Sequence, residues 1–247
     1  LCLARARAVI DLRHRHDHPE LMDDLALAGD ELRHNLDELE VINTWLGGYA
    51  PVLRGLALLS AEWARSRPLR IADIGCGGGD TLRVIARWAA RRGQPVHLTG
   101  IDANPFMITY ARAKCADWPT IQFEAINIFS DEFRRHTYDI ITCSLFCHHF
   151  TDAALVQLLR QLAGQARLGV VVNDLHRHPI AYYCIKWLTR LLNGSRLVRH
   201  DAPLSVARAF RRADLLSICE RAAVRVVRLR WRWAFRWELV VARPEQN

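Results

Sequence analysis

Residues 71–80 read IADIGCGGGD and set four glycines between a β-rich run and the start of a helix. Gly75, Gly77, Gly78 and Gly79 allow a sharp turn and let a ligand lie against bare main chain. The helix that follows, expected over residues 80–92, offers the free N–H groups of its first turn. This pattern predicts a ligand-binding turn between a strand and a helix.

A carboxylate follows at the end of the next predicted strand, Asp102 in GIDANP. In doubly wound nucleotide sites an acid at this position binds the hydroxyls of an adenosine ribose. The dinucleotide fingerprint needs a third glycine at position 80, where this chain has Asp80, an unfavourable neighbour for a pyrophosphate. No Gly-Lys-Ser/Thr follows the loop either, so the sequence favours an adenosine ligand without phosphates.

The chain is expected to consist of an N-terminal helical cap or lid region, residues 1–66, and a ligand-binding domain, residues 67–247, that contains the glycine loop. Leucines at spacings of three, four and seven predict an amphipathic helical cap over 19–46, ended by Gly47 and Gly48. From 70 to 175, β-rich runs alternate with helix-length connections, which predicts a parallel sheet with helices on both faces. Helices are expected over 179–193 and 211–222. Residues 224–243 form two strands without a helix between them, so at least one strand is antiparallel.

The glycine motif, GIDANP and YDIITCSLFCHHF together resemble class I S-adenosylmethionine-dependent methyltransferases over roughly 70–243. The chain also resembles the small-molecule enzymes of quinone biosynthesis. The resemblance implies an α/β Rossmann-like sheet of seven mostly parallel strands, one of them antiparallel. It also implies S-adenosyl-L-methionine as the cofactor.

The resemblance also implies where the cofactor lies. Gly75 and Gly77 would face its methionine part and Asp102 its ribose. Ala103 would lie by the adenine, and Ser144 beside the sulfonium. Asn127 stands where relatives often carry an acid near the adenine. The full set of expected cofactor contacts is Asp73, Gly75, Cys76, Gly77, Gly79, Asp102, Ala103, Asn127, Ile128 and Ser144.

Methyl transfer to a phenol needs a base beside an aligned acceptor. His148 and His149 follow the fourth predicted strand, and His176 with Arg177 follows the fifth, at the edge where open α/β sheets bind ligands. The three histidines are the catalytic candidates, against the alternative that each only caps or anchors its loop. The spacing of Cys143, Cys147 and the two adjacent histidines matches no common zinc pattern, so no metal is predicted.

The function expected from these features is O-methylation of a phenolic or quinone-like small molecule. The helix at 19–46 and the aromatic segment 180–192 would cover the acceptor. The alternatives are a nucleic-acid (tRNA) methyltransferase and a non-catalytic cofactor-binding protein. An NAD(P) dehydrogenase is disfavoured by Asp80 and by the final hairpin. The sequence leaves the acceptor and the oligomeric state open.

The net charge and the cysteines of the chain indicate its binding partners and its cellular compartment. The 247 residues carry a net charge of +8, and all basic residues except Lys114 and Lys186 are arginine. Seven arginines lie between 221 and 243, where Arg228, Arg230 and Arg232 alternate with apolar residues. In the resembled topology the first of the two strands in 224–243 lies at the sheet edge, which implies a basic sheet edge and not a nucleic-acid footprint, with contact to an anionic membrane surface as a lesser alternative. Seven scattered cysteines and no long apolar run predict a reduced, cytoplasmic protein.

Overall fold

The strands of the sheet differ in how much of their surface is covered, which fixes their places. Every residue of β7 (Arg236–Ala242) and all but the last of β4 (Tyr138–Ser144) are buried, whereas β6 (Arg225–Arg232) is largely half-exposed or exposed. Strands covered on both faces lie inside a sheet, and a partly exposed strand lies at its edge. The computed structural model, which describes residues 10–243, shows this order as β3-β2-β1-β4-β5-β7-β6.

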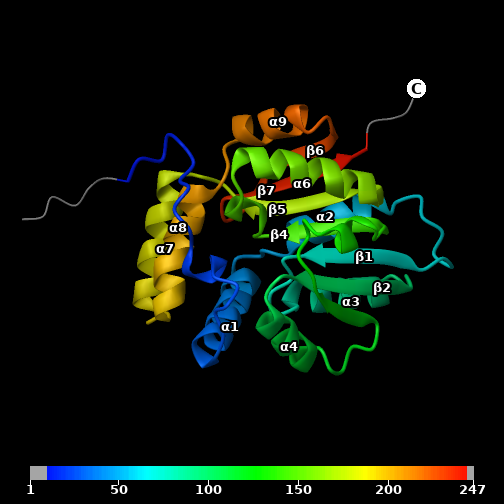
Figure 1. Cartoon of the computed structure of the whole chain (residues 1–247), viewed down its shortest axis with the longest axis horizontal. Coiled ribbons are helices and arrows are strands. Elements are labelled where there is room, and N and C mark those ends of the chain that lie inside the picture. The colour runs from blue at the N-terminus through cyan, green and yellow to red at the C-terminus, as the bar shows by residue number, and fades with distance from the viewer. Residues whose placement is uncertain (1–9, 244–247) are drawn as a thin grey trace, which may run out of the picture.

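Strand direction confirms the expected topology. The five strands β1 (Leu69–Ile74), β2 (Val96–Asp102), β3 (Ile121–Ala125), β4 and β5 (Ala166–Leu175) pair in parallel. Strand β7 runs antiparallel to both β5 and β6. It is therefore the antiparallel strand that the helix-free hairpin predicted, and β6 is the edge strand (Figure 1).

Helices cover both faces of the sheet (Figure 1). On one face α2 (Ala50–Leu59), α3 (Asp80–Arg91) and α4 (Pro105–Lys114) pack into one core cluster. On the other, α5 (Asp131–Arg134), α6 (Asp152–Gln165) and α9 (Arg212–Arg221) pack into a second. Helix α2 approaches so closely that a Cβ at Gly55 would overlap the side chain of Val171 on β5. It is thus part of the sheet's covering layer, although the sequence grouped it with the cap.

The remaining helices gather near the carboxyl end of the parallel strands. They are η1 (Leu21–Asp23), α1 (Asp30–Trp45), η2 (Cys147–His149), α7 (Pro179–Leu191) and α8 (Arg196–Arg208). The single helix expected over 19–46 is wrong at its start, because Gly29 breaks it with a φ of 98° and η1 is one short 3-10 turn. Helix α8, which contains Pro203, was not predicted. Within residues 10–243, no helix is long and apolar enough to cross a membrane.

The arginine-rich edge is more internally paired than its sequence indicated. A register shift separates Val226 from Arg228. Beyond it, Arg228 and Arg232 both donate hydrogen bonds to Glu238 on β7, which is fully buried. Trp231 on the same strand is 48% exposed. The arginines of this edge therefore neutralise a buried carboxylate as well as protecting the edge.

Candidate functional site

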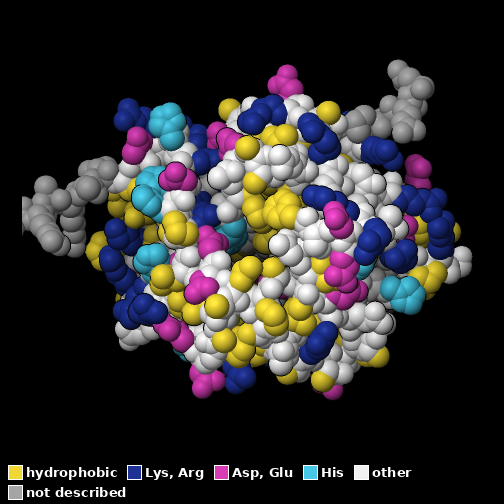
Figure 2. Space-filling model, in the orientation of Figure 1, with side chains coloured by type: hydrophobic (Ala, Val, Ile, Leu, Met, Phe, Trp, Pro, Cys, Tyr) yellow, Lys and Arg dark blue, Asp and Glu magenta, His cyan; other side chains and the backbone are white. Residues whose placement is uncertain are grey.

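One cavity of about 480 Å³ opens at the carboxyl ends of β1, β2 and β4. Its floor is the glycine loop and the strand ends, and its roof comes from η1, the segment that follows it, and α1. In the view of Figure 2, hydrophobic side chains gather beside the hollow near the centre of this face. A volume of this size suits a cofactor or small ligand.

Gly75 of the glycine loop lies too close to a neighbouring ring to carry a side chain. Gly75 has a φ of 66°, and a Cβ there would overlap the ring of Phe146, which also lines the cavity. The loop is fixed by its main chain: Gly75 N–H donates to the carbonyl of Ile101 at 2.8 Å. The result is a stretch of exposed backbone facing the cavity, as the sequence predicted.

Asp102 lies next to this loop with both carboxylate oxygens turned to main-chain donors. The N–H of Gly77 donates to Oδ2 at 3.2 Å and that of Asn104 to Oδ1 at 2.9 Å. Burial raises the pKa of Asp102, and these two donors oppose the rise. The carboxylate is held in one orientation at the cavity wall, where its remaining lone pairs can accept hydrogen bonds from a ligand.

The structure places eight of the ten expected cofactor residues in the cavity wall: Gly75, Cys76, Gly77, Asp102, Ala103, Asn127, Ile128 and Ser144. Asp73 and Gly79 do not line it. Asp73 is buried within the sheet and accepts a hydrogen bond from Thr142 Oγ1 at 2.6 Å; burial raises its pKa to about 7. Gly79 is the N-cap of α3 and packs against Phe123.

Asp80 and Tyr49 are site residues that the sequence did not reveal. The Tyr49 hydroxyl donates to Asp80 Oδ2 at 2.6 Å, and Asp80 lines the cavity. Burial raises the pKa of Asp80. In the sequence, Asp80 served only as an argument against a pyrophosphate. Tyr49 lies in a different part of the chain, and nothing in its surroundings there pointed to this contact.

Part of the cavity wall is apolar and carries one histidine. Phe146 and Phe150 meet edge to face at 5.0 Å, and Met22 and Leu25 from the N-terminal segment line the same region. His149 lines the wall between them. An aromatic ring of a ligand would fit against this part of the wall, next to a titratable nitrogen.

His149 is held from the opposite side by Asp23 of η1. Its Nδ1 lies 2.5 Å from Asp23 Oδ1. Burial alone would raise the pKa of Asp23, but hydrogen bonds from His149 and Arg208 hold it well below its usual range. An ionised carboxylate on Nδ1 fixes the proton there and leaves Nε2 as the basic nitrogen.

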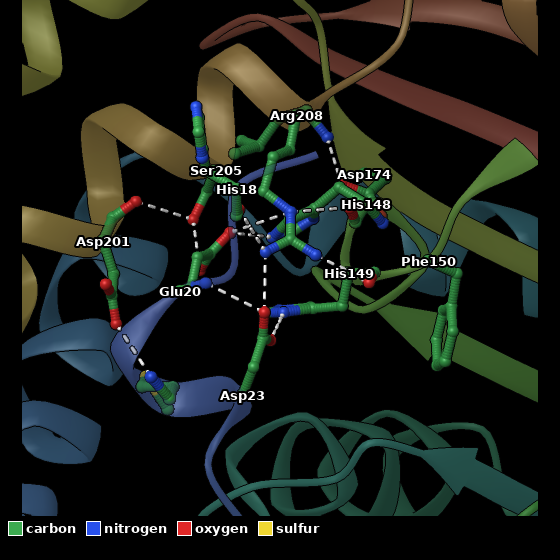
Figure 3. Close-up of polar contacts among 12 residues, drawn as sticks. His18, Glu20, Asp23, His148, His149, Phe150, Asp174, Asp201, Ser205 and Arg208 are labelled. Atoms are coloured by element: carbon green, nitrogen blue, oxygen red, sulfur yellow. Dashed lines mark hydrogen bonds and ion pairs between the residues drawn. The ribbon is translucent and has the colours of Figure 1, made fainter. Parts of the chain in front are cut away.

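His148 lies behind His149 and outside the cavity, with the two rings 4.3 Å apart. It is buried, and its Nδ1 lies 2.7 Å from Oδ1 of Asp174 at the end of β5. Burial opposes ionisation of Asp174, yet His148 keeps the pKa of that carboxyl lowered. The Nε2 of His148 faces Glu20 Oε1 at 3.6 Å (Figure 3).

Glu20 and Arg208 complete this polar cluster (Figure 3). Burial raises the pKa of Glu20 to about 7, and its Oε2 accepts a hydrogen bond from Ser205 Oγ at 2.9 Å. The guanidinium of Arg208 on α8 donates to the carbonyls of His148 and His149 and to Asp23 Oδ2. The sequence signal for Glu20 and Asp23 was weak, since two acids three residues apart are typical of a helix start.

His176, the third predicted histidine, is not brought to the cavity. Its Nδ1 accepts a hydrogen bond from Trp231 at 3.2 Å, and its ring lies against Phe235 and Trp237. Burial lowers the pKa of His176 to about 4. Arg177 beside it binds main-chain carbonyls and Asp214. These contacts show that His176 and Arg177 anchor their loop, which was the alternative to a catalytic role.

Residues 71–169 match the sequence family of the methyltransferase domain. Curated relatives include the ubiquinone biosynthesis O-methyltransferases of Aeromonas salmonicida, 34% identical, and of Neisseria meningitidis serogroup C, 30% identical. The matched segments cover 46% and 60% of this chain, and 46% and 64% of those relatives. The chain therefore spans between about half and two thirds of the length of these relatives.

Solved structures share the fold. A methyltransferase from Aquifex aeolicus superposes with a TM-score of 0.57 at 14% identity, over 86% of this chain and 98% of the other. A magnesium protoporphyrin IX methyltransferase from Synechocystis, with bound S-adenosylmethionine, superposes with a TM-score of 0.53 at 15% identity, over 90% and 89%. At this identity the likeness concerns the fold alone.

Proposed function

The chain carries a class I S-adenosylmethionine-dependent methyltransferase domain, and from this premise we propose that it methylates an oxygen of a small aromatic acceptor, phenolic or quinone-like. One observation carries the proposal: the glycine loop, Asp102 and His149 line the same cavity. That cavity combines a surface for the cofactor with an apolar stretch of wall that carries a base.

The residues present fit S-adenosylmethionine. Gly75 and Gly77 supply bare main chain for the methionine part, and the carboxylate of Asp80 would attract its ammonium group. Asp102 would accept hydrogen bonds from the ribose hydroxyls, with Ala103 and Asn127 toward the adenine. When bound, the cofactor supplies a methyl group on a positively charged sulfur.

His149 is the residue that would prepare the acceptor. With Nδ1 committed to Asp23, its Nε2 can take the hydroxyl proton as the oxygen bonds to the methyl carbon and the carbon–sulfur bond breaks. Phe146 and Phe150 would orient the acceptor ring and exclude water. The protein's main contribution is alignment of the oxygen about 3 Å from the methyl carbon.

The test is incubation of the chain with isotope-labelled S-adenosylmethionine and a panel of catechols, hydroxyquinones and simple phenols, followed by mass spectrometry. We expect one labelled methyl on a ring oxygen of some panel members. The same assay includes tRNA and duplex DNA as acceptors. Label in nucleic acid, or cofactor binding without transfer to any acceptor, would contradict the proposal.

A further inference from the structure

Three groups of metal-ligand type converge beside the cavity, and one of them, His149, also lines it. A carboxylate oxygen of Glu20 and one ring nitrogen each of His148 and His149 lie within 4.8 Å of one another. Glu20 comes from the N-terminal segment and the histidines from the loop after β4 (Figure 3). Sequence spacing predicted no metal because the third group is remote from the histidines in the chain.

Each histidine already has the second partner that metal-bound histidines usually have. Asp174 holds Nδ1 of His148 at 2.7 Å, and Asp23 holds Nδ1 of His149 at 2.5 Å. A carboxylate on one ring nitrogen fixes the tautomer and makes the other nitrogen a better ligand. Nε2 of each ring is therefore the nitrogen prepared for a cation.

Glu20 supplies an independent sign that its carboxylate is incompletely paired. It is 5% exposed, and among the described residues its Oε1 has no hydrogen-bond partner; Arg208 Nε lies 3.8 Å from it, too far for a hydrogen bond. The 3.6 Å between this oxygen and His148 Nε2 is too long for a hydrogen bond. Two ligands of one tetrahedral zinc ion, each bound at about 2.0–2.1 Å, lie roughly 3.3 Å apart, so a shared cation accounts for the spacing.

The charges around the histidines also favour a cation. Three carboxylates, Glu20, Asp23 and Asp174, contact the two rings or their partners, and the guanidinium of Arg208 is paired with this set. When all three carboxylates are ionised, as a bound cation would favour, and the imidazoles are neutral, three negative charges and one positive leave two negative charges. Arg15, which also reaches the His148 carbonyl, has its own carboxylate partner in Asp152. One divalent ion would neutralise the cluster.

We propose that Glu20, His148 and His149 bind one divalent transition-metal ion, with zinc as the best match. Two histidines and one glutamate are a ligand set of catalytic zinc sites, which keep a fourth position open. Magnesium and calcium prefer oxygen ligands throughout. The open position would lie beside the cavity that His149 lines.

The metal site can be tested independently of the proposed function. The effect of the metal on methylation, by contrast, rests on the proposed function. An acceptor hydroxyl that reaches the open position loses its proton more easily because the positive ion stabilises the oxyanion. In the metal-loaded protein His149 is a ligand and would not take this proton, which would pass to solvent water before the oxygen bonds to the methyl carbon.

The experiment uses the full chain stripped with a chelator and titrated with Zn²⁺ against a chromophoric competitor. We expect one high-affinity Zn²⁺ per chain. Co²⁺ in place of zinc should give the intense visible bands of a tetrahedral site. Binding of less than one Zn²⁺ per chain in the competition, or only the weak spectrum of hydrated Co²⁺, would overturn the proposal. Neither measurement needs a variant.

Variants assign the ligands. Asp174→Asn changes a residue that only positions a ligand and should lower Zn²⁺ affinity by ~10–100-fold. Glu20→Gln keeps the shape of the side chain but removes a direct ligand, so it should lower Zn²⁺ affinity by more than this. The control is Glu38→Gln, because Glu38 also pairs with a histidine, His34 at 3.4 Å, and accepts a hydrogen bond from the backbone N–H of Ser195. Zinc binding undiminished in Glu20→Gln, or equally reduced in Glu38→Gln, would overturn the assignment.

Binding and catalysis are read out separately. S-adenosylmethionine affinity, measured by calorimetry on stripped and zinc-loaded chain, should be the same within about twofold, since none of the ligands is an expected cofactor contact. A stoichiometric, Glu20-dependent zinc site in a chain that methylates no acceptor supports the site and contradicts the proposed function. Methylation of an acceptor by a chain that binds no zinc supports the proposed function and contradicts the zinc site.

Discussion

His148 and His149 are adjacent in the chain, yet their side chains have different surroundings. His149 lines the cavity and is held by Asp23, whereas His148 is buried behind it against Asp174 and Glu20. The sequence could predict that two histidines meet the ligand edge of the sheet, because β4 ends just before them. It could not say which one faces the ligand, because that depends on acids supplied by distant segments.

His149→Ala should lower kcat by about 10²–10⁴-fold, the usual contribution of a positioned base. Cofactor affinity should change little, because His149 lies in the apolar part of the cavity wall. Steady-state kinetics with an active acceptor and calorimetry with S-adenosylmethionine measure the two quantities. His176→Ala is the control, since His176 lies outside the cavity. Equal losses of kcat in both variants would remove His149 from its assigned role.

Gly75→Ala should weaken both folding and cofactor binding. Its φ of 66° strains any other residue, and a Cβ would also overlap the Phe146 ring. We expect a loss of about 1–3 kcal/mol in the free energy of unfolding, by urea titration. Gly93→Ala is the matched control, because Gly93 has a φ of 62° and nothing within 4 Å of an added Cβ. If both variants lose equal stability and retain full cofactor affinity, the close approach to Phe146 does not matter.

At the scale of elements, tertiary contacts override the leucine spacing before α1. Leu21 and Leu25 fit the same helical pattern as the residues of α1, so periodicity could not show that the chain bends at Gly29. The segment instead forms η1, whose Asp23 reaches His149 and whose N-cap Glu20 reaches Ser205 on α8. Helix α8 was missed partly because Pro203 lies inside it.

Arg208→Ala should show how strongly α8 and η1 organise the site. Arg208 is buried and donates to the carbonyls of His148 and His149 and to Asp23, so its removal leaves buried acceptors unpaired. We expect the free energy of unfolding to fall by about 3 kcal/mol, as for a broken buried ion pair. Arg199→Ala, on the exposed side of the same helix, should stay within about 0.5 kcal/mol. Denaturant titration of both variants compares them, and equal midpoints would contradict the role of Arg208.

At the scale of the whole molecule, the alternation of strands and helices predicted a mostly parallel sheet, and the hairpin without a helix predicted an antiparallel strand; both are confirmed. The resemblance to a known family, and not the pattern, identified the last strand as the antiparallel one and placed the first hairpin strand at the edge, as β7 and β6 show. Net charge was a poorer guide to binding partners, because it does not show which arginines are paired with carboxylates inside the protein. Arg228 and Arg232 neutralise the buried Glu238, and Arg83 pairs with Glu40, so part of the arginine surplus serves the fold.

Global stability should fall on mild acidification partly through His176. Burial, aided by the nearby cations of His178, Arg211 and Arg177, lowers its pKa from 6.5 to about 4 in the folded chain. Between these values the unfolded chain binds a proton that the folded chain does not, so stability is lost as pH falls from about 6.5 toward 4. His176→Asn can still accept from Trp231 and does not titrate. Urea titrations across this range should show a shallower decline for the variant than for the unsubstituted chain, whereas parallel curves would mean that His176 does not contribute to the acid response.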